Sequence, residues 1–343
     1  MREKITPLHL LQPPAADGLI LAGDIGGTKI DLGLFQNVRG KLHLLSAKNY
    51  STQATRSLTD LISWFLTTEL KSGKIVSACL GIAGPLIGNR VDGANLPWEV
   101  DGDELAAHFS WPRVTLLNDL VALAHAIPHL TPRQITTINA GVKSAAPGNI
   151  GLLAAGTGLG QSLLVWNGTR HLPCSSEGGH RDFAPRRGLE FRLQQFLAAI
   201  HGHVSVERVL SGEGLTQIYA FLLEENGVIP GPAHQPYLKD PRAITTAALA
   251  MQELFCRQAL AIFVDLYGAE AGNLALQGLT LGGIYLGGGI APQIIPAILE
   301  GSFMASFCAK GRMQPLLATI PVHLIVDSLA TLLGAAAYAQ QHR

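Results

Sequence analysis

The sequence predicts an α/β protein of two domains with mixed sheets, and three observations lead to that prediction. Strand-like apolar runs alternate with segments of helical periodicity, which is typical of α/β layering. A strand, a glycine-rich turn and a second strand occur at residues 19–35 and again at 150–166, and such hairpins add antiparallel pairs to a sheet. The length of 343 residues exceeds what one hydrophobic core usually serves.

The first domain is predicted from the order of its apolar runs. Residues 19–23 and 30–35 are short alternating segments around a glycine turn, and we expect two paired strands there. Leu58, Leu61 and Phe65 follow helical spacing within residues 57–70. The remaining elements of this domain are a strand at 75–85 that ends in glycines and a proline, a strand at 113–119 and a helix at 120–127.

The second domain follows a segment rich in Pro, Gly and Ser. Residues 129–149 have the composition of a connection, with the boundary expected at Pro128–Pro132. Beyond the hairpin at 150–166 we expect helices at 188–202 and along 243–277, strands at 278–292 and 322–327, and a last helix at 329–341. That last helix is expected to return to the first domain. The predicted small domain is therefore 1–129 plus 327–343, and the large domain is 130–326.

The composition excludes several classes of function. Lys+Arg and Asp+Glu are both 25 and the pI is about 7.2, so no global field favours nucleic acid or an anionic membrane. The four cysteines lie far apart without a CxxC pair, which argues against structural zinc and suits a reducing cytoplasm. No continuously apolar stretch approaches 20 residues, so no membrane span is expected, and the first 18 residues are expected to form a loose tail.

Three glycine-rich turns each follow a strand: GDIGGT at 23–28, AGTGLG at 155–160 and LGGGIAP at 286–292. Neither the P-loop nor the dinucleotide-binding pattern is present. Glycine lets backbone N–H groups approach an anion closely, and Thr28 and Thr157 add hydroxyl donors. Facing turns of this kind could hold a triphosphate. Taken alone, the first turn could be one that needs positive φ, and AGTGLG could be a plain hairpin turn, but three such turns in one chain favour nucleotide binding.

Polar residues near the strand ends are the candidates for chemistry. Asp24 lies beside the first turn, where a carboxylate would hold Mg²⁺ through water, although it could simply form an Asx turn. Asn118 and Asp119 lie where a strand ends and a helix begins. Ligands bind at such strand ends in open α/β sheets, but an N-cap is an equal use of the pair.

Two further segments carry groups suited to sugar hydroxyls. Glu177 and His180 are separated by two glycines that would leave room for a ligand, and Glu207 lies in a short segment before an expected Ser-Gly turn. A polar surface loop and a solvated or capping glutamate are the alternatives. A metal site of the HExxH type is absent.

These residues, in this order, resemble the bacterial ATP-dependent glucokinase family of the actin–hexokinase–Hsp70 superfamily. The matching segments are GDIGGT, LLNDL, AGTGLG, SSEGGH, HVSVERVLSG and LGGGIAP, with IPVHLIV and LLGAA near the end. They cover nearly the whole chain after residue 18. The resemblance implies a two-domain actin/hexokinase-like (ribonuclease H-like) fold with a central cleft, and transfer of the γ-phosphoryl group of ATP to the 6-hydroxyl of glucose.

The resemblance also implies roles for individual residues. Asp119 would be the catalytic base. The residues holding sugar hydroxyls would be Asn118, Asp119, Glu177, His180 and Glu207. Those holding ATP would be Gly23, Asp24, Ile25, Gly26, Gly27, Thr28, Gly156, Thr157, Gly158, Gly287, Gly288 and Gly289, with Mg²⁺ near Asp24 through water. A cytoplasmic homodimer is implied as well.

The sequence departs from the family pattern at two places. Lys29 stands where many members have asparagine, and both this lysine and GANLPW at 93–98 resemble the related ROK sugar kinases. The cysteine-rich zinc motif of ROK proteins is absent after His180, which favours the glucokinase branch. A kinase for another hexose or amino sugar and an actin-like ATPase without a sugar substrate stay open. A sugar-responsive repressor is not expected, because the residues before the first hairpin are too few for a helix-turn-helix module.

Overall fold

The computed structural model describes residues 18–84, 86–91, 96–142 and 147–342. The chain divides into two compact units, the first within Met1–Ala126 and Thr331–Arg343 and the second within Ile127–Ala330. The two units are described separately below. Most of the tail expected over the first 18 residues, and the first three residues of GANLPW, lie outside the described residues.

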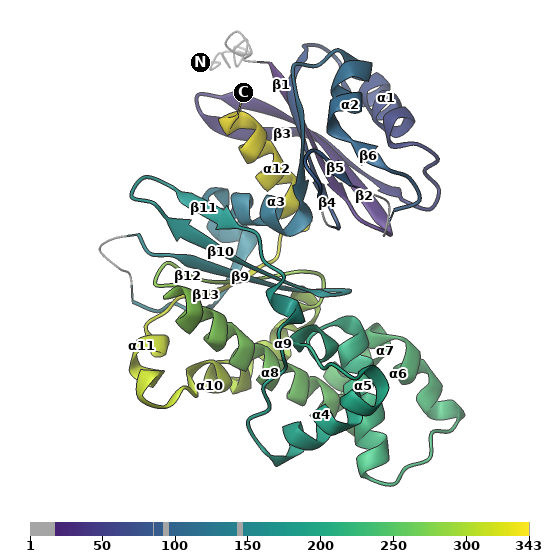
Figure 1. The fold of residues 1–343 in the computed structure, drawn as a ribbon, viewed down its shortest axis with the longest axis vertical. Coiled ribbons are helices and arrows are strands. Elements are labelled where there is room, and N and C mark those ends of the chain that lie inside the picture. The colour runs from purple at the N-terminus through teal and green to yellow at the C-terminus, as the bar shows by residue number, and fades with distance from the viewer. Residues whose placement is uncertain (1–17, 85, 92–95, 143–146, 343) are drawn as a thin grey trace, which may run out of the picture. The chain divides into compact units, whose positions relative to one another are not determined.

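The first unit is built on a mixed five-stranded sheet (Figure 1). Strand β1 pairs antiparallel with β2 and parallel with β4, and β4 pairs parallel with β7, which confirms the prediction of a mixed sheet. The order of the strands is β3 (Lys41–Ser51), β2 (Lys29–Val38), β1 (Leu19–Ile25), β4 (Ile75–Ile82) and β7 (Val114–Asn118). A separate small ladder joins β5 (Arg90–Val91) and β6 (Val100–Asp101).

Four helices cover this sheet: α1 (Leu58–Glu69), α2 (Gly102–Phe109), α3 (Asp119–Ala126) and α12 (Ala330–Gln341). Ile62 and Phe65 of α1 belong to the apolar core formed with the sheet, as their helical spacing predicts. Helices α3 and α12 touch at Gly334, where an added Cβ would lie 1.7 Å from the carbonyl oxygen of Ala122. The glycine of the LLGAA segment is therefore required by close helix packing.

The second unit contains a six-stranded sheet with the same strand pattern. Its order is β11 (His171–Cys174), β10 (Leu159–Trp166), β9 (Ile150–Ala155), β12 (Gly283–Gly287), β13 (Val322–Ile325) and β8 (Ile135–Asn139). The hairpin strands β10 and β11 lie on one side of β9, and the parallel strands β12 and β13 lie on its other side. The strands of the first unit are arranged about β1 in the same way. The repeated topology agrees with the duplication that the two glycine-turn hairpins suggest.

One expectation for the second unit was wrong, and another is confirmed with an interruption. Residues 129–149 contain strand β8, which pairs with β13, so the segment is more than a connection. The helical region at 243–277 is two helices, α7 (Pro241–Leu249) and α8 (Leu254–Gly278). Met251 takes a positive φ of 59° between them, and the Glu253 carboxylate caps α8 by accepting from the N–H of Cys256.

The other helices of the second unit are mostly short. They are α4 (Gly188–His201), α5 (Gly212–Glu225), α6 (Gln235–Lys239), α9 (Ile295–Leu299), α10 (Ser302–Cys308) and α11 (Gln314–Ala318). The 3₁₀ helices of the chain, all in this unit, are η1 (Ile127–His129), η2 (Pro132–Gln134), η3 (Gly178–His180), η4 (Val206–Arg208), η5 (Pro232–His234), η6 (Ala291–Ile294) and η7 (Gly311–Met313), counted over the described residues.

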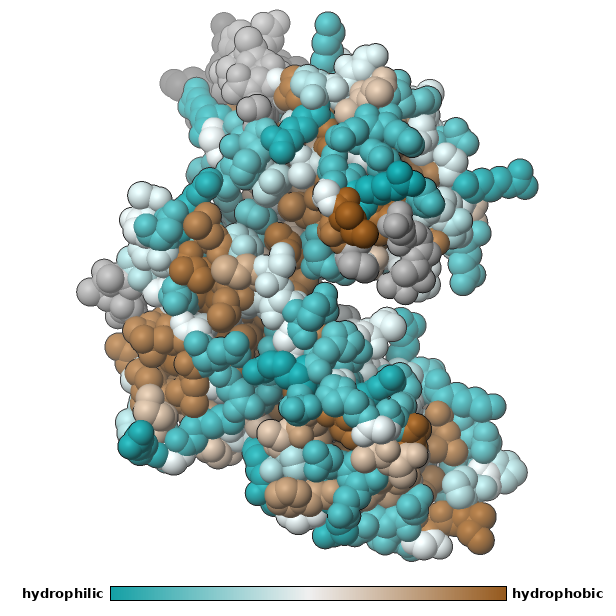
Figure 2. Space-filling model, viewed as in Figure 1, coloured by the Kyte–Doolittle hydropathy of each residue, from teal (hydrophilic) through white to brown (hydrophobic). Residues whose placement is uncertain are grey.

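Helix α8 is the central core helix of the second unit. By length and composition it could cross a membrane, but 72% of its most apolar window is buried inside the structure. Phe263 and Tyr267 are fully buried within the apolar core of that unit. On the face shown in Figure 2, hydrophilic residues are interspersed with smaller apolar patches.

Candidate active site

Three parallel strands of the first unit end at the same edge of the sheet. The register places Ile25 of β1 beside Ile82 of β4, and Ile82 beside Asn118 of β7. Asp24 and Asp119 therefore lie near one sheet edge, two strands apart. This is where ligands bind in open α/β sheets.

The GDIGGT turn is a tight connection whose tip is exposed. The N–H of Gly26 donates to the carbonyl of Lys29 at 2.9 Å, and the Thr52 hydroxyl donates to the carbonyl of Gly26 at 2.6 Å. Gly27 and Thr28 are exposed. Gly26 does not have a left-handed φ, so the explanation that this glycine serves a positive φ is wrong.

Two of the residues predicted to hold ATP lie in the buried strand that leads into the turn. Gly23 and Ile25 are buried within β1. A Cβ on Gly23 would lie 2.6 Å from the Leu80 side chain, so this glycine is required by packing against β4. Side chains that a ligand could contact at the first turn are therefore those of Asp24 and of the exposed residues after Gly26.

Asp24 is a carboxylate that its surroundings push towards the neutral form. Burial raises its pKa to about 6, and the nearby Asp119 adds to that rise. The Lys29 ammonium and a hydrogen bond with Thr331 act in the opposite direction. Thr331 lies at the start of α12, so the last helix brings a hydroxyl to the same strand ends.

Gly81 of β4 lies beside Asp24 of β1 and lets two helices approach the sheet closely. A Cβ there would lie 3.0 Å from Ala122 Cβ, 3.3 Å from Thr331 Cγ2 and 3.5 Å from Asp119 Cα. The absence of a side chain at residue 81 therefore serves the packing of the starts of α3 and α12 against β4, which places Asp119 and Thr331.

Asn118 is the N-cap of α3, which confirms the capping explanation for this residue. Its Oδ1 accepts from the N–H of Leu120 at 3.0 Å and more weakly from that of Val121 at 3.4 Å. Its Nδ2 lies 3.4 Å from the carbonyl oxygen of Gly84, a long contact that a ligand could replace. Capping therefore uses the oxygen of the amide, while its nitrogen makes only this long contact.

Asp119 is the first residue of α3 and keeps one oxygen engaged. Its Oδ1 accepts from the N–H of Leu120 at 2.8 Å. Burial raises the pKa of Asp119 despite the backbone N–H groups that favour its charged form. A carboxylate with a raised pKa accepts a proton more readily near neutral pH.

The donor set at this edge fits a hydrated magnesium ion bound with a nucleotide. Among the residues that the structure describes, no group of three or more His, Cys, Asp or Glu side chains is arranged to hold a metal by itself. Mg²⁺ keeps several waters and is commonly held by one or two carboxylates together with substrate phosphates. Asp24 supplies such a carboxylate, and a nearby dication would favour its ionised form.

In the second unit the two remaining glycine turns lie side by side. They follow β9 and β12, which are parallel neighbours with Gly287 beside Ala154. The N–H of Gly156 donates to the carbonyl of Gly158 at 2.8 Å. Gly288 has a φ of 82°, and a Cβ there would lie 2.2 Å from the carbonyl oxygen of Ala155. Positive φ and close backbone approach thus explain this glycine.

Glu207 supports the first of these two turns. Its Oε2 accepts from the N–H of Leu159 at 2.9 Å, and a Cβ on Gly158 would lie 2.5 Å from the same oxygen. Glu207 belongs to η4, and the Ser211–Gly212 pair that follows is not the expected turn. Ser211 instead caps α5 by accepting from the N–H of Gly214.

Glu177 precedes η3, His180 is its last residue, and both side chains face solvent. Their side chains are 85% and 61% exposed, and His180 Nε2 lies 3.8 Å from Glu177 Oε2. The glycines between them pack against strand β10, since a Cβ on Gly179 would lie 2.1 Å from the carbonyl oxygen of Leu159. The structure gives these glycines a packing role, where the sequence suggested room for a ligand.

The predicted residues fall into two sets. The first unit contains Asp24, the turn at 26–28, Asn118 and Asp119. The second unit contains Gly156–Gly158, Glu177, His180, Glu207 and Gly287–Gly289. Sequence reasoning missed Thr52, Gly81 and Thr331, because only their contacts across the fold associate them with the site.

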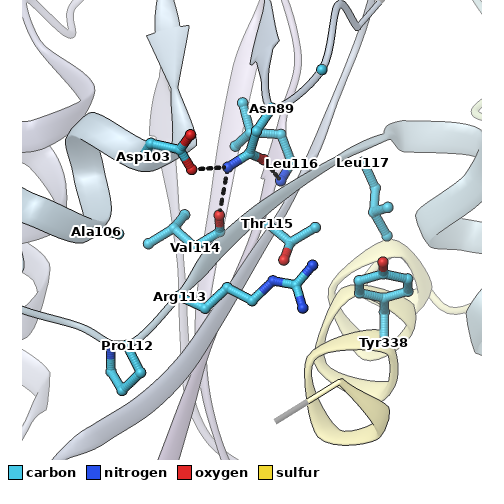
Figure 3. A pocket seen from close by; sticks show the side chains of 11 residues that line it. Asn89, Asp103, Ala106, Pro112, Arg113, Val114, Thr115, Leu116, Leu117 and Tyr338 are labelled. Carbon is cyan, nitrogen blue, oxygen red and sulfur yellow. Dashed lines mark hydrogen bonds between the residues drawn. The ribbon is translucent and has the colours of Figure 1, made fainter.

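A cavity of about 490 Å³ lies elsewhere in the first unit, on the free edge of β7 (Figure 3). Asn89 covers this edge like a neighbouring strand, accepting from the N–H of Leu116 and donating to the carbonyl of Val114, both at 2.9 Å. Arg113 and Tyr338 also line the cavity. None of the residues predicted for catalysis or binding does.

Comparison with known proteins agrees with this geometry. A family model described as glucokinase matches residues 21–342. The chain is 40% identical over 335 residues to a glucokinase from Nostoc sp., with 93% of this chain and 98% of that protein covered. It is similar to the crystal structure of a glucokinase from an Antarctic psychrotroph, with a TM-score of 0.84, 32% identity, and coverage of 94% and 99% of the two chains.

A ROK family glucokinase from Streptomyces griseus, solved with glucose and AMPPNP, shares the fold at a TM-score of 0.64 and 21% identity, with 94% of this chain and 100% of that chain covered. The match over nearly the full length, together with the glycine turns and the two carboxylates at the strand ends, leads to one conclusion: this chain belongs to the glucokinase family.

Proposed function

We propose that this chain transfers the γ-phosphoryl group of ATP to the 6-hydroxyl of glucose. The observation that carries the proposal is Asp119, a partly buried carboxylate with a raised pKa beside Asp24 at the strand ends of a glucokinase-family chain. Phosphoryl transfer requires positioning, charge stabilisation and a group that accepts the proton of the attacking hydroxyl. Asp119 has the chemistry for the last of these.

Asp119 acts as the general base in this proposal. Its Oδ1 is held by the N–H of Leu120, which fixes the carboxylate and leaves Oδ2 for the sugar 6-hydroxyl. The raised pKa brings the group closer to the working pH, which favours proton transfer in the transition state. Asn118, whose Oδ1 caps α3, presents its Nδ2 to an adjacent sugar hydroxyl.

The second unit supplies the other sugar contacts. Glu177 and His180 are exposed and offer acceptors and donors for vicinal hydroxyls. Glu207 supports the turn at 156–158 through Oε2 and has Oε1 for the sugar. A site that bonds each hydroxyl rejects analogues that lack one, because buried polar groups are then left unpaired.

The glycine turns and Asp24 are proposed to hold the nucleotide. The N–H groups of Gly26 and Gly156 close the two turns, so the donors proposed for phosphate oxygens are those of the residues that follow them, Gly27 and Thr28 in the first turn and Thr157 and Gly158 in the second. Mg²⁺ near Asp24 would neutralise charge on the phosphates. Lys29 and Thr331 favour the ionised form of Asp24 and so oppose the rise in its pKa that burial causes.

A kinase for another hexose or an amino sugar is the second candidate, and Lys29 is the observation that favours it. This lysine replaces the asparagine of many family members, and its ammonium lies 2.8 Å from Asp31, close enough to Asp24 to lower the pKa of that carboxyl. A protein of the ROK family from Streptomyces griseus is itself named a glucokinase. The ROK-like lysine is therefore also compatible with glucose as the substrate.

ADP release measured over a panel of sugars tests these candidates. The protein is assayed with Mg²⁺ and ATP alone, and then with glucose, mannose, 2-deoxyglucose or N-acetylglucosamine. We expect little ADP without sugar, a large increase with glucose, and weak activity with the others. Equal turnover with and without sugar would indicate an actin-like ATPase. Higher activity with another sugar would replace glucose by that sugar as the proposed substrate.

Location and assembly are also proposed. The four cysteines of the chain are unpaired in the structure, which suits the reducing cytoplasm where ATP is available. In that compartment the product would enter glycolysis. The family resemblance implies a homodimer, and light scattering of the purified protein gives the mass that checks it.

A further inference from the structure

Helix α8 carries a buried carboxylate that the proposed chemistry does not use. Glu270 is 6% exposed. Its Oε1 accepts from Gln161 Nε2 at 2.7 Å and from the Arg181 guanidinium, and its Oε2 accepts from Asn273 Nδ2 at 2.9 Å. Burying a carboxylate is costly unless it is paired and hydrogen-bonded, and here both oxygens have partners.

Arg181 connects this carboxylate to both segments that carry the proposed sugar contacts. Its Nε donates to the carbonyl of Gly178 in η3 at 3.0 Å. Its own backbone carbonyl accepts from the N–H of Val206, the first residue of η4, at 2.9 Å. Arg181 directly follows His180, so the side chain and the backbone of one residue hold η3 and η4 together.

Gln161 completes the arrangement from strand β10. Its Oε1 accepts from the Arg181 guanidinium at 3.0 Å, and a Cβ on Gly178 would lie 2.6 Å from that oxygen. Gln161 is 2% exposed. One face of η3 therefore rests on a fully hydrogen-bonded polar group.

The sugar-binding side chains have little support of their own. Glu177 and His180 are largely exposed, and their closest polar contact to each other is 3.8 Å. Their positions therefore depend on the backbone of η3. A constellation of this kind keeps its geometry only if the surrounding groups are locked.

The basic residues around η3 are not a free anion-binding patch. Arg186 pairs with Glu190 at 2.7 Å, and Arg187 pairs with Asp265 at 2.8 Å. Arg181 pairs with Glu270. Each guanidinium is thus paired with a buried or partly buried acidic side chain. This pairing points to a role in positioning η3.

We propose that Glu270 is a positioning residue for sugar recognition, acting through Arg181 and Gln161 on η3 and η4. The proposal rests on the proposed function, in which Glu177, His180 and Glu207 bind the sugar. Loss of the pairing would let both segments shift without touching the sugar directly. A misplacement of about 1 Å can cost about 10²-fold in catalysis, so an effect from the interior is expected.

Three proteins test it against a matched control. Glu270→Gln keeps the shape and removes the charge, Arg181→Met removes the donors to Gly178 and Glu270, and the double variant combines them. Glu190→Gln is the control, because Glu190 is equally buried at 4% exposed and is paired with Arg186 and Arg187, but makes no hydrogen bond to η3. Thermal unfolding and the KM values for glucose and ATP are measured for each.

The expected result is a selective loss of glucose affinity. Both single variants should raise the KM for glucose by about 10-fold or more while the KM for ATP stays within about twofold. The double variant should be no worse than the more affected single variant, because the two residues act as one unit. Glu190→Gln should lower the melting temperature without changing the KM for glucose.

The opposite pattern overturns the proposal. If Glu270→Gln and Arg181→Met lose stability as Glu190→Gln does but keep the wild-type KM for glucose, the network is only structural. The Arg181 side chain is 41% exposed, so its replacement disturbs the core less than a change at Glu270. If Glu270→Gln does not fold, the KM of Arg181→Met for glucose decides the question. Absence of glucose-dependent activity in the wild type would instead refute the proposed function.

Discussion

Asp119 and Asp24 are two carboxylates at the same end of the sheet in the first unit, and their protonation is the residue-scale basis of the proposed chemistry. Burial raises the pKa of both, and each has a group that opposes the rise: the N–H of Leu120 for Asp119, and Lys29 for Asp24. The two acids differ in the role proposed for them. Asp119 takes a proton from the sugar, while Asp24 must be ionised to attract a cation.

Asp119→Asn tests the base. Asparagine keeps the shape and the acceptor for the N–H of Leu120, so the fold should survive. General-base catalysis typically contributes about 10²–10⁴-fold, and we expect kcat to fall by at least about 10²-fold. Steady-state kinetics with circular dichroism as the control for folding give the answer. Turnover close to that of the wild type would remove Asp119 from this role.

Asp24→Asn tests the electrostatic cost of the site through the pH dependence of stability. Because the pKa of Asp24 rises from the ordinary 3.8 to about 6 on folding, the native state binds more protons than the unfolded state between those values. Stability from this residue therefore falls as pH rises from about 4 to about 6, and the penalty at neutral pH is roughly 3 kcal/mol.

Asparagine resembles the neutral acid and removes this penalty. Asp24→Asn should be more stable than the wild type at pH 7.5 in urea unfolding, with the difference shrinking towards pH 4, and it should be nearly inactive. A difference in stability that is the same at both pH values would show that Asp24 is not the titrating group.

At the scale of elements, the contact between α3 and α12 places the base. A Cβ on Gly334 would lie 1.7 Å from the carbonyl oxygen of Ala122, and α3 begins with Asp119. Gly334→Ala should force the helices apart, lowering the melting temperature by several degrees and reducing kcat. Gly231→Ala is the control, because it has no neighbour within 4 Å and no left-handed φ. Equal effects of the two substitutions would contradict this packing role.

The strands next to the glycine turns could be predicted from neighbouring residues. Other elements depend on contacts with residues far away in the sequence. The hairpins β1–β2 and β9–β10 follow from alternation and glycine turns that neighbouring residues encode. Strand β8 was missed because its partner β13 lies far along the chain, and its Pro- and Gly-rich surroundings resemble a linker. The break before α8 depends on a positive φ at Met251, and methionine is not a residue type from which a positive φ can be predicted.

The candidate site shows the same division. Asp24, Asn118 and Asp119 could be predicted because they follow strands whose carboxyl ends meet at one edge. The packing role of Gly179 could not, because it depends on the carbonyl of Leu159 in another strand. Glu270 lies 90 residues after His180 in the sequence and gives no local sign of its link to η3.

At the scale of the whole molecule, the two units repeat one topology and contribute different groups. The first carries Asp119 and Asp24, and the second carries Glu177, His180 and Glu207. The chain passes between the units at residues 126–127 and again at 330–331. In the proposed function neither unit has the full set of groups, so each unit expressed alone should be inactive.

The position of the phosphate on the product tests the central claim most directly. The purified protein is incubated with Mg²⁺, ATP and ¹³C-labelled glucose, and the product is analysed by ³¹P and ¹³C NMR. We predict one ADP for each glucose 6-phosphate, with phosphorus coupled to carbon 6 of the sugar. A phosphate on another carbon, or ADP formed without any phosphorylated sugar, would contradict the account.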